Sequence, residues 1–186
     1  MLFLHKKVFS TLMTDYTYKI LVIGPAAVGK SSLIRRFVDN EFSLQYKFTI
    51  GVDFMTKNIV NNLNKSIRLT IWDIGGQDRF KILRRSFYDG AHGAIVVFDL
   101  SRPYTYSKMK DWISDMYKIT QKKIPIVILG NKLDLISEIG ETIERNDPYK
   151  YAEKEHYLYL ETSAKTGENV ENAFTEITNR ILDKNY

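Results

Sequence analysis

Residues 24–33 combine the residue types that a phosphate-binding loop requires. The segment reads GPAAVGKSSL, with Gly24 and Gly29 followed by Lys30 and Ser31, and it joins an apolar run to an amphipathic stretch. Backbone N–H groups and the positive end of a following helix would bind phosphate, while Lys30 would bridge phosphate oxygens and Ser31 would ligate Mg²⁺. The alternative is an ordinary glycine-rich turn with an exposed lysine. The expected nucleotide contacts here are Gly24, Ala26, Ala27, Val28, Gly29, Lys30, Ser31 and Ser32.

Two alanines distinguish this loop, because Ala26 and Ala27 stand where bare glycine would let a phosphate come closest. The phosphate contacts themselves come from backbone N–H groups, which a methyl group leaves in place. We expect the methyl of Ala26 instead to crowd the space beside the γ-phosphate. The sequence therefore predicts binding with slow phosphoryl chemistry.

A second short pattern, Asp73-Ile74-Gly75-Gly76, follows another apolar run. A carboxylate at a strand end can hold a water on Mg²⁺, and the small Gly76 lets its backbone N–H approach a γ-phosphate. A strand-ending turn is the alternative for so short a pattern.

Two further strand-end segments could select the base. Asp134, in the sequence NKLD, could accept hydrogen bonds from N1–H and the exocyclic amine of guanine, whereas adenine offers a lone pair at N1. A site built around such a pair rejects the analogue that cannot form it by roughly 10⁴–10⁵. In residues 161–165, ETSAK, backbone N–H groups would meet the guanine O6 and Lys165 would pack near the base. The expected base contacts are Asn131, Lys132, Asp134, Ser163, Ala164 and Lys165.

Short apolar runs alternate with amphipathic stretches along the chain, which is typical of an α/β fold with a mostly parallel sheet covered on both faces. Ligands of such sheets bind at the carboxyl ends of the strands, where these polar residues cluster. The pattern predicts strands at residues 18–24, 51–60, 67–74, 93–100, 125–135 and 157–162, the second and third forming a hairpin. It predicts helices at residues 30–40, 104–120, 141–156 and 169–186, the third with an unclear start because of Pro148.

The length of 186 residues and the composition fit one globular domain, which we place at residues 17–186 after an extension at residues 1–16. The net charge is +5, but basic pairs alternate with acidic residues, so we expect no nucleic-acid partner. The chain has no cysteine, which excludes disulfides, thiolate metal sites, a cysteine nucleophile and thioether or thioester lipids. We expect a cytoplasmic monomer.

Residues 1–13, MLFLHKKVFSTLM, leave three interpretations open. They are a mobile extension, an interfacial amphipathic helix that contacts membrane peripherally, or leader translated upstream of Met13. Leu2 follows Met1, so myristoylation is excluded and any membrane contact would not use lipidation.

The four motifs, in this order and at strand ends, resemble the Ras superfamily of small GTPases across residues 17–184. The resemblance is greatest to the Rab branch, through TIGVDF (49–54), WDIGGQDRF (72–80), FYDGAHGAIVVFD (87–99) and ETSAK (161–165). It implies a single P-loop NTPase domain with a six-stranded sheet. The pair Ile74-Gly75 departs from the Rab pattern, resembles the Arf branch, and predicts a looser second switch.

The resemblance implies a molecular switch that binds GTP or GDP with Mg²⁺ and slowly hydrolyses GTP. Thr49 would join Ser31 and Asp73 around Mg²⁺ and touch the γ-phosphate through its backbone. Phe42 would pack across the guanine. Gln77 would orient the attacking water and Lys30 would neutralise charge, which are the two catalytic roles.

The same resemblance implies effectors, exchange factors and GTPase-activating proteins that bind residues 42–54 and 74–88. Phe54, Trp72 and Tyr88 match an apolar surface set, although Phe54 and Trp72 could equally be strand core. Two other functions remain open: a GTP-binding module with little or no hydrolysis, and a nucleoside or nucleotide kinase. The kinase would need an arginine-rich lid, and no insertion is long enough to supply one.

Overall fold

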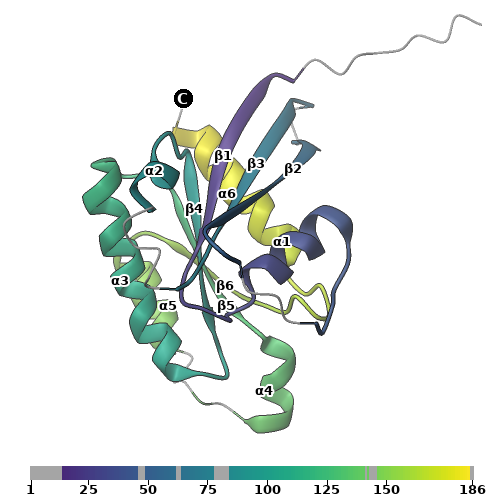
Figure 1. The fold of residues 1–186 in the computed structure, drawn as a ribbon, viewed down its shortest axis with the longest axis vertical. Helices are drawn as coiled ribbons and strands as arrows, with labels where there is room; N and C mark the ends of the chain where they lie inside the picture. Colours follow the sequence, from purple (N-terminus) through teal and green to yellow (C-terminus); the bar gives the residue numbers. More distant parts are fainter. Residues whose placement is uncertain are drawn as a thin grey trace, which may run out of the picture.

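The computed structural model describes residues 14–45, 49–61, 64–77, 84–140, 142 and 146–184. Strands and helices alternate along these residues (Figure 1). The strands are β1 (Tyr16–Ile23), β2 (Val52–Val60), β3 (Ser66–Ile74), β4 (Gly93–Asp99), β5 (Ile126–Asn131) and β6 (Leu158–Thr162). The helices are α1 (Lys30–Asp39), α2 (Arg84–Tyr88), α3 (Pro103–Thr120), α4 (Leu133–Ile139), α5 (Asn146–Lys154) and α6 (Val170–Lys184).

The strands form one six-stranded sheet in the order β2-β3-β1-β4-β5-β6. Only the β2–β3 hairpin is antiparallel, and every other neighbouring pair is parallel. Strands β4 and β5 are buried along their whole length, as continuous apolar runs in a covered parallel sheet should be. The predicted α/β class with a mostly parallel six-stranded sheet is confirmed.

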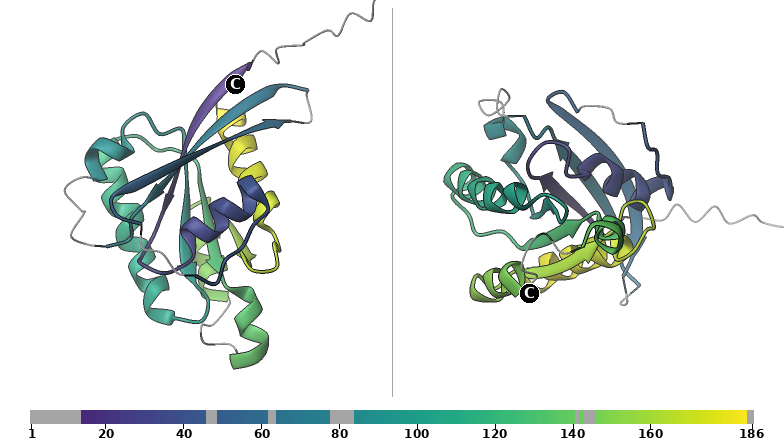
Figure 2. Two further views of the ribbon diagram at one scale, coloured as in Figure 1. Left: turned by 45° about the vertical axis from the view of Figure 1, so that its right-hand side comes forward. Right: turned by 90° about the horizontal axis from the view of Figure 1, so that it is seen from below.

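Helices cover both faces of this sheet (Figure 2). On one face α1 and α6 enclose a core in which the rings of Phe37 and Phe174 stack with centroids 4.0 Å apart. On the other face α2, α3 and α5 enclose a second core, to which α3 contributes Met109 and Trp112. None of the helices in the described ranges is long and apolar enough to cross a bilayer.

The structure differs from the sequence prediction mainly after β5. The predicted strand 125–135 ends at Asn131, and α4 begins at Leu133 after Lys132 adopts a left-handed backbone with φ 70°. Helix α2 was not predicted. Pro148 lies in the first turn of α5, where its missing N–H costs no helical hydrogen bond. Of the predicted helix 141–156, residues 141 and 143–145 lie outside the described ranges.

Candidate nucleotide-binding site

A pocket of about 700 Å³ opens beside the carboxyl ends of β1, β3 and β5 and the loop after β6. That size is typical of pockets for small organic ligands. Its lining brings together most of the residues predicted from sequence: Ala26, Ala27, Gly29, Lys30, Ser31, Ser32, Phe42, Thr49, Asp73, Gly76, Gln77, Asn131, Lys132, Asp134, Ala164 and Lys165.

Three predicted contacts, Gly24, Val28 and Ser163, are not part of this lining and instead support residues that are. The carbonyl of Gly24 accepts a hydrogen bond from Lys30, and the hydroxyl of Ser163 donates to Asp134. Val28 is fully buried.

Lys30 is held inside the curve of the phosphate loop. Its Nζ is buried and donates to the carbonyl oxygens of Gly24 (3.0 Å) and Pro25 (2.8 Å). Because Lys30 is also the first residue of α1, the ammonium lies at the positive end of that helix. Positive charge and helix N-terminus coincide, which is the electrostatic arrangement that binds phosphate.

Oxygen atoms of Ser31, Thr49 and Asp73 converge at one point of the pocket. The two hydroxyl oxygens lie 2.9 Å apart, and Thr49 donates to Asp73 Oδ2 at 2.9 Å. Ser31 Oγ donates to the same carboxylate oxygen. Asp73 Oδ1 is buried and has no hydrogen-bond partner among the residues that the structure describes. Hydroxyl and carboxylate oxygens suit Mg²⁺, so these residues fit the predicted cation.

Asp73 is the one carboxylate among the three side chains that converge at the candidate cation site. The described residues include no group of three or more His, Cys, Asp or Glu side chains arranged to hold a metal. Mg²⁺ is commonly bound by one or two carboxylates together with substrate phosphates and water. The donor set at Asp73 matches that pattern.

Gly76 and Gly75 lie where no side chain fits. A Cβ on Gly76 would lie 2.5 Å from the backbone N of Ala26. A Cβ on Gly75 would lie 2.9 Å from the carbonyl oxygen of Thr49, and the Gly75 N–H donates to Gly51 at 2.8 Å. The segment after β3 therefore contacts both the phosphate loop and the segment that carries Thr49.

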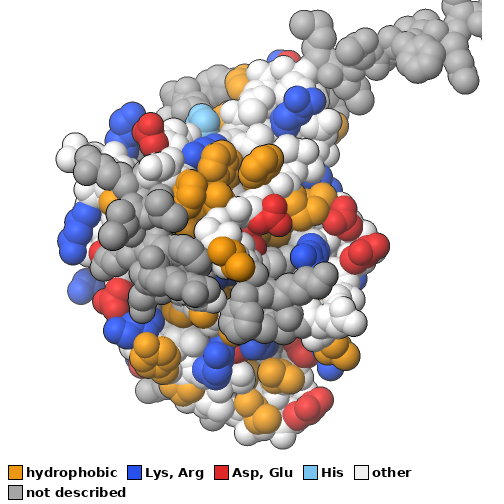
Figure 3. Space-filling view, viewed as in Figure 1, with side chains coloured by type: hydrophobic (Ala, Val, Ile, Leu, Met, Phe, Trp, Pro, Cys, Tyr) orange, Lys and Arg blue, Asp and Glu red, His pale blue; other side chains and the backbone are white. Residues whose placement is uncertain are grey.

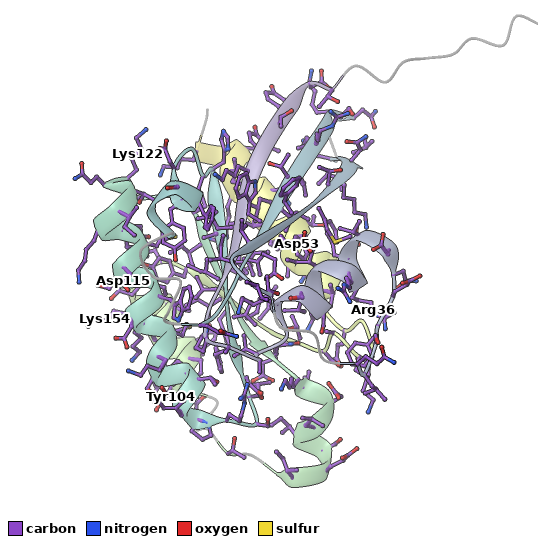
Figure 4. The ribbon with its side chains drawn as sticks, in the orientation of Figure 1. Arg36, Asp53, Tyr104, Asp115, Lys122 and Lys154 are labelled. Atoms are coloured by element: carbon purple, nitrogen blue, oxygen red, sulfur yellow. The ribbon has the colours of Figure 1, made fainter. Side chains whose placement is uncertain are left out.

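Asp134 is fixed at the opposite end of the pocket. Its Oδ1 accepts a hydrogen bond from Ser163 Oγ at 2.6 Å, and its Oδ2 lies 3.9 Å from Lys165 Nζ. Arg36 of α1, labelled in Figure 4, stabilises the loop after β6 by donating to the carbonyls of Ala164 and Lys165, both at 2.9 Å. One oxygen of the carboxylate is thus held while the group still lines the pocket.

Asn131 connects the two ends of the pocket. Its Nδ2 donates to the carbonyl of Val28 at 2.9 Å, and its Oδ1 accepts from the backbone N–H of Ala164 at 3.3 Å. The side chain is buried. Its observed hydrogen bonds position the phosphate loop against the loop after β6. The sequence pattern did not reveal this role.

A buried carboxylate that the sequence analysis did not select lies behind the pocket. Asp99 ends β4, is fully buried, and its Oδ2 contacts Lys132 Nζ at 2.7 Å and Arg102 Nε at 2.8 Å. Burial by itself would raise the pKa of Asp99, but hydrogen bonds from Lys132, Ser101 and Arg102 outweigh it and lower the pKa. The sequence feature that could have identified Asp99 is its position, because it is the polar residue at the end of an apolar strand.

An aromatic cluster lies on the surface over β2 and β3. The ring of Trp72 lies 5.9 Å from Phe54, which is 66% exposed, and 6.5 Å from Phe87. Lys19 Nζ lies 3.8 Å above the Trp72 ring. Hydrophobic side chains gather over this part of the sheet in Figure 3. The expectation that Tyr88 belongs to this surface is wrong: Tyr88 is fully buried, and its neighbour Phe87 lies beside Trp72 instead.

The model of the Ras family matches residues 19–183. This chain belongs to the Ras family. Among similar proteins, Rab11A of Lotus japonicus is 40% identical over 169 residues, covering 91% of this chain and 74% of that protein. Rab-4A of Danio rerio is 40% identical over 170 residues, covering 91% of this chain and 78% of that protein. RABA1c of Arabidopsis thaliana is 40% identical over 167 residues, covering 90% of this chain and 76% of that protein.

This Rab-like GTPase accordingly binds GTP and GDP with Mg²⁺, hydrolyses GTP, and works with regulators and effectors of the kind that its family uses. The predicted activity and cofactors are confirmed. The kinase alternative and the binding module without hydrolysis do not agree with this membership.

Proposed function

We propose that the pocket holds Mg²⁺·GTP with its phosphates on residues 24–32 and its guanine against Asp134. The observation that carries this assignment is the convergence of Ser31, Thr49 and Asp73 oxygens beside the buried Lys30, where Asp73 Oδ1 has no partner within the described part of the chain. Phe42, which is partly buried and lines the pocket, would pack across the base. The phosphates and the base of the nucleotide are thereby bound by different segments at the same edge of the sheet.

In this assignment Ser31 and Thr49 supply hydroxyl oxygens to Mg²⁺, and Asp73 supplies a carboxylate to the metal or its water. Bound Mg²⁺ neutralises charge that develops on the phosphate oxygens. Because the three side chains contact one another closely, a shift of Thr49 would change the contacts of Asp73. Loss of the γ-phosphate would therefore free Thr49 from the metal site.

For hydrolysis, Gln77 would orient a water in line with the γ-phosphate, and Lys30 would stabilise the charge on the transferred group. The oxygen of that water forms a bond to phosphorus, the bond to the β–γ bridging oxygen breaks, and GDP and phosphate leave. Gln77 lines the pocket directly after Gly76. Ala26 lines the same pocket as Gln77, and its methyl would crowd the space beside the γ-phosphate, which supports slow intrinsic hydrolysis.

The two switch segments would respond together. The Gly75 N–H donates to the Gly51 carbonyl at 2.8 Å, so the segment of Thr49 and the segment of Gly76 contact each other. GTP would order both through its γ-phosphate, and GDP would release both. Gly75 admits this close contact because it has no side chain.

Effectors and regulators would read that change at residues 42–54 and 74–88. The cluster of Phe54, Trp72 and Phe87 gives this surface an aromatic centre of the type that forms binding hot spots. We expect the chain to be a monomer until such a partner binds.

We also propose a cytoplasmic location for a domain spanning residues 17–186. Any membrane contact would be peripheral and would involve residues 1–13, which lie outside the described residues. Sedimentation with anionic liposomes, compared between the whole chain and a version starting at Met13, tests this; binding that survives the truncation would contradict it.

Replacing Ser31 by Asn should separate the two nucleotides. We expect Ser31→Asn to weaken Mg²⁺·GTP binding more than tenfold further than GDP binding, since the metal contributes several kcal/mol mainly beside the γ-phosphate. Fluorescent-nucleotide titration with and without Mg²⁺ measures both affinities. Ser107→Asn is the matched control, because Ser107 is exposed on α3 and its hydroxyl donates to the carbonyl of Tyr104 in the same helix. An equal loss for GTP and GDP would contradict the proposed metal role.

A further inference from the structure

Ala27 of the phosphate loop has a backbone conformation that alanine disfavours. Its φ is +61°, in the left-handed region where the Cβ of an L-residue is crowded by its own backbone. Glycine would adopt this conformation freely. The sequence nevertheless places alanine here, so another interaction must stabilise the loop in this shape.

Arg102 supplies that interaction. Its Nη2 donates to the carbonyl oxygen of Ala27 at 2.7 Å and lies 3.4 Å from that of Ala26. Rotation of Ala27 toward the favoured right-handed region would turn its carbonyl and break the shorter bond. The hydrogen bond from Arg102 therefore opposes relaxation of the strained residue.

The guanidinium is anchored on its other side by Asp99. Nε of Arg102 donates to Asp99 Oδ2 at 2.8 Å, while Ser101 donates to Oδ1 through its backbone N–H and its hydroxyl. Asp99 is fully buried, so its position is set by the end of β4. A planar guanidinium can satisfy a carboxylate and a carbonyl at once, which an ammonium does less well.

The same carboxylate oxygen also accepts Lys132, at 2.7 Å, from the segment that precedes Asp134. Asp99 thus connects two parts of the site. Arg102 links it to the phosphate loop, and Lys132 links it to the segment that carries Asp134. Neither Asp99 nor Arg102 is among the residues that line the pocket. Their effect on a nucleotide would be indirect.

We propose that Arg102 is a positioning residue that holds Ala27, and with it the phosphate loop, in the conformation that binds nucleotide. Arg102 thereby slows nucleotide release without touching the nucleotide. This inference rests on the proposed nucleotide site. Arg102 allows alanine at position 27 in this chain. It also couples the conformation of the phosphate loop to the buried end of β4.

The first test is the dissociation rate of a fluorescent GDP analogue from the Mg²⁺-bound protein. Arg102→Ala should accelerate release about tenfold, and Arg102→Lys should fall between it and the wild type. Arg68→Ala is the matched control and should leave the rate unchanged, because Arg68 on β3 is exposed and contacts Asn58 away from the pocket. Wild-type rates in Arg102→Ala would overturn the proposal, and if that variant does not fold, wild-type rates in Arg102→Lys would do so.

A double-mutant cycle with Ala27→Gly shows whether Arg102 acts through Ala27. In the Ala27→Gly background, where no strain needs to be opposed, Arg102→Ala should accelerate release by about twofold or less. A full tenfold acceleration in both backgrounds would mean that Arg102 acts on the fold in general and would overturn the proposal. If the wild-type chain bound no GDP, the proposed nucleotide site itself would be wrong, which is a distinct outcome.

Discussion

Asp134→Asn should exchange the base preference of this GTPase, lowering its affinity for GTP by about 10⁴-fold and creating affinity for XTP. The carboxylate accepts both N1–H and the exocyclic amine of guanine in the proposed pose, and an amide presents a donor to one of them. Xanthine carries an oxygen at C2 that accepts from this amide. Ser163, which donates to Asp134 Oδ1 at 2.6 Å, would still orient the side chain through its remaining oxygen.

Competition titrations with GTP, XTP and ATP on the same preparation measure this exchange. Glu138→Gln is the matched control, since Glu138 is an exposed carboxylate on the same helix, α4, and should change none of the three affinities. A wild-type protein that bound ATP within tenfold of GTP would contradict the guanine assignment.

Gln77→Leu should lower the single-turnover rate of GTP hydrolysis about 10²-fold while leaving nucleotide affinity intact. Leucine fills similar space but cannot hold a water in line with the γ-phosphate. Lys30, Ser31 and Asp73 would continue to bind the phosphates and metal, so affinity on the same sample serves as the internal control. Hydrolysis at the wild-type rate would show that Gln77 does not position the water.

Ala26→Gly should have the opposite and smaller effect, a modest rise in the hydrolysis rate. Its backbone N lies 2.5 Å from where a Cβ on Gly76 would be, so Ala26 borders the segment that carries Gln77. Removing the methyl gives Gln77 more room without altering backbone phosphate contacts. The same single-turnover assay checks it, and a slower rate would contradict the crowding argument.

The parts of the site that follow from sequence are those encoded by a few adjacent residues. Lys30 and Ser31 are placed by a strand, a glycine-rich loop and a helix, each with its own local pattern, and the structure brings them to Asp73 as parallel topology requires. Asp134 was also predicted, although not its helix. Helix α4 is short, and its apolar residues continue those of β5, so no change in periodicity marks where the strand ends.

The parts that sequence could not predict depend on side-chain direction and on long-range contacts. Phe87 and Tyr88 are adjacent aromatic residues, and only the rotation of α2 decides that Phe87 contacts Trp72 while Tyr88 is buried. The bond from Arg102 to Ala27 joins residues 75 positions apart, and no spacing rule connects them. Its importance follows only once the positive φ of Ala27 is known.

The most direct test of the central claim, that one pocket holds a guanine nucleotide with Mg²⁺, is the nucleotide content of the purified chain. Chromatography of the nucleotide released on denaturation should give GDP or GTP at close to one molecule per chain, with dissociation accelerated when Mg²⁺ is chelated. Adenine nucleotide in its place, or no bound nucleotide after incubation with Mg²⁺ and GTP, would contradict the account.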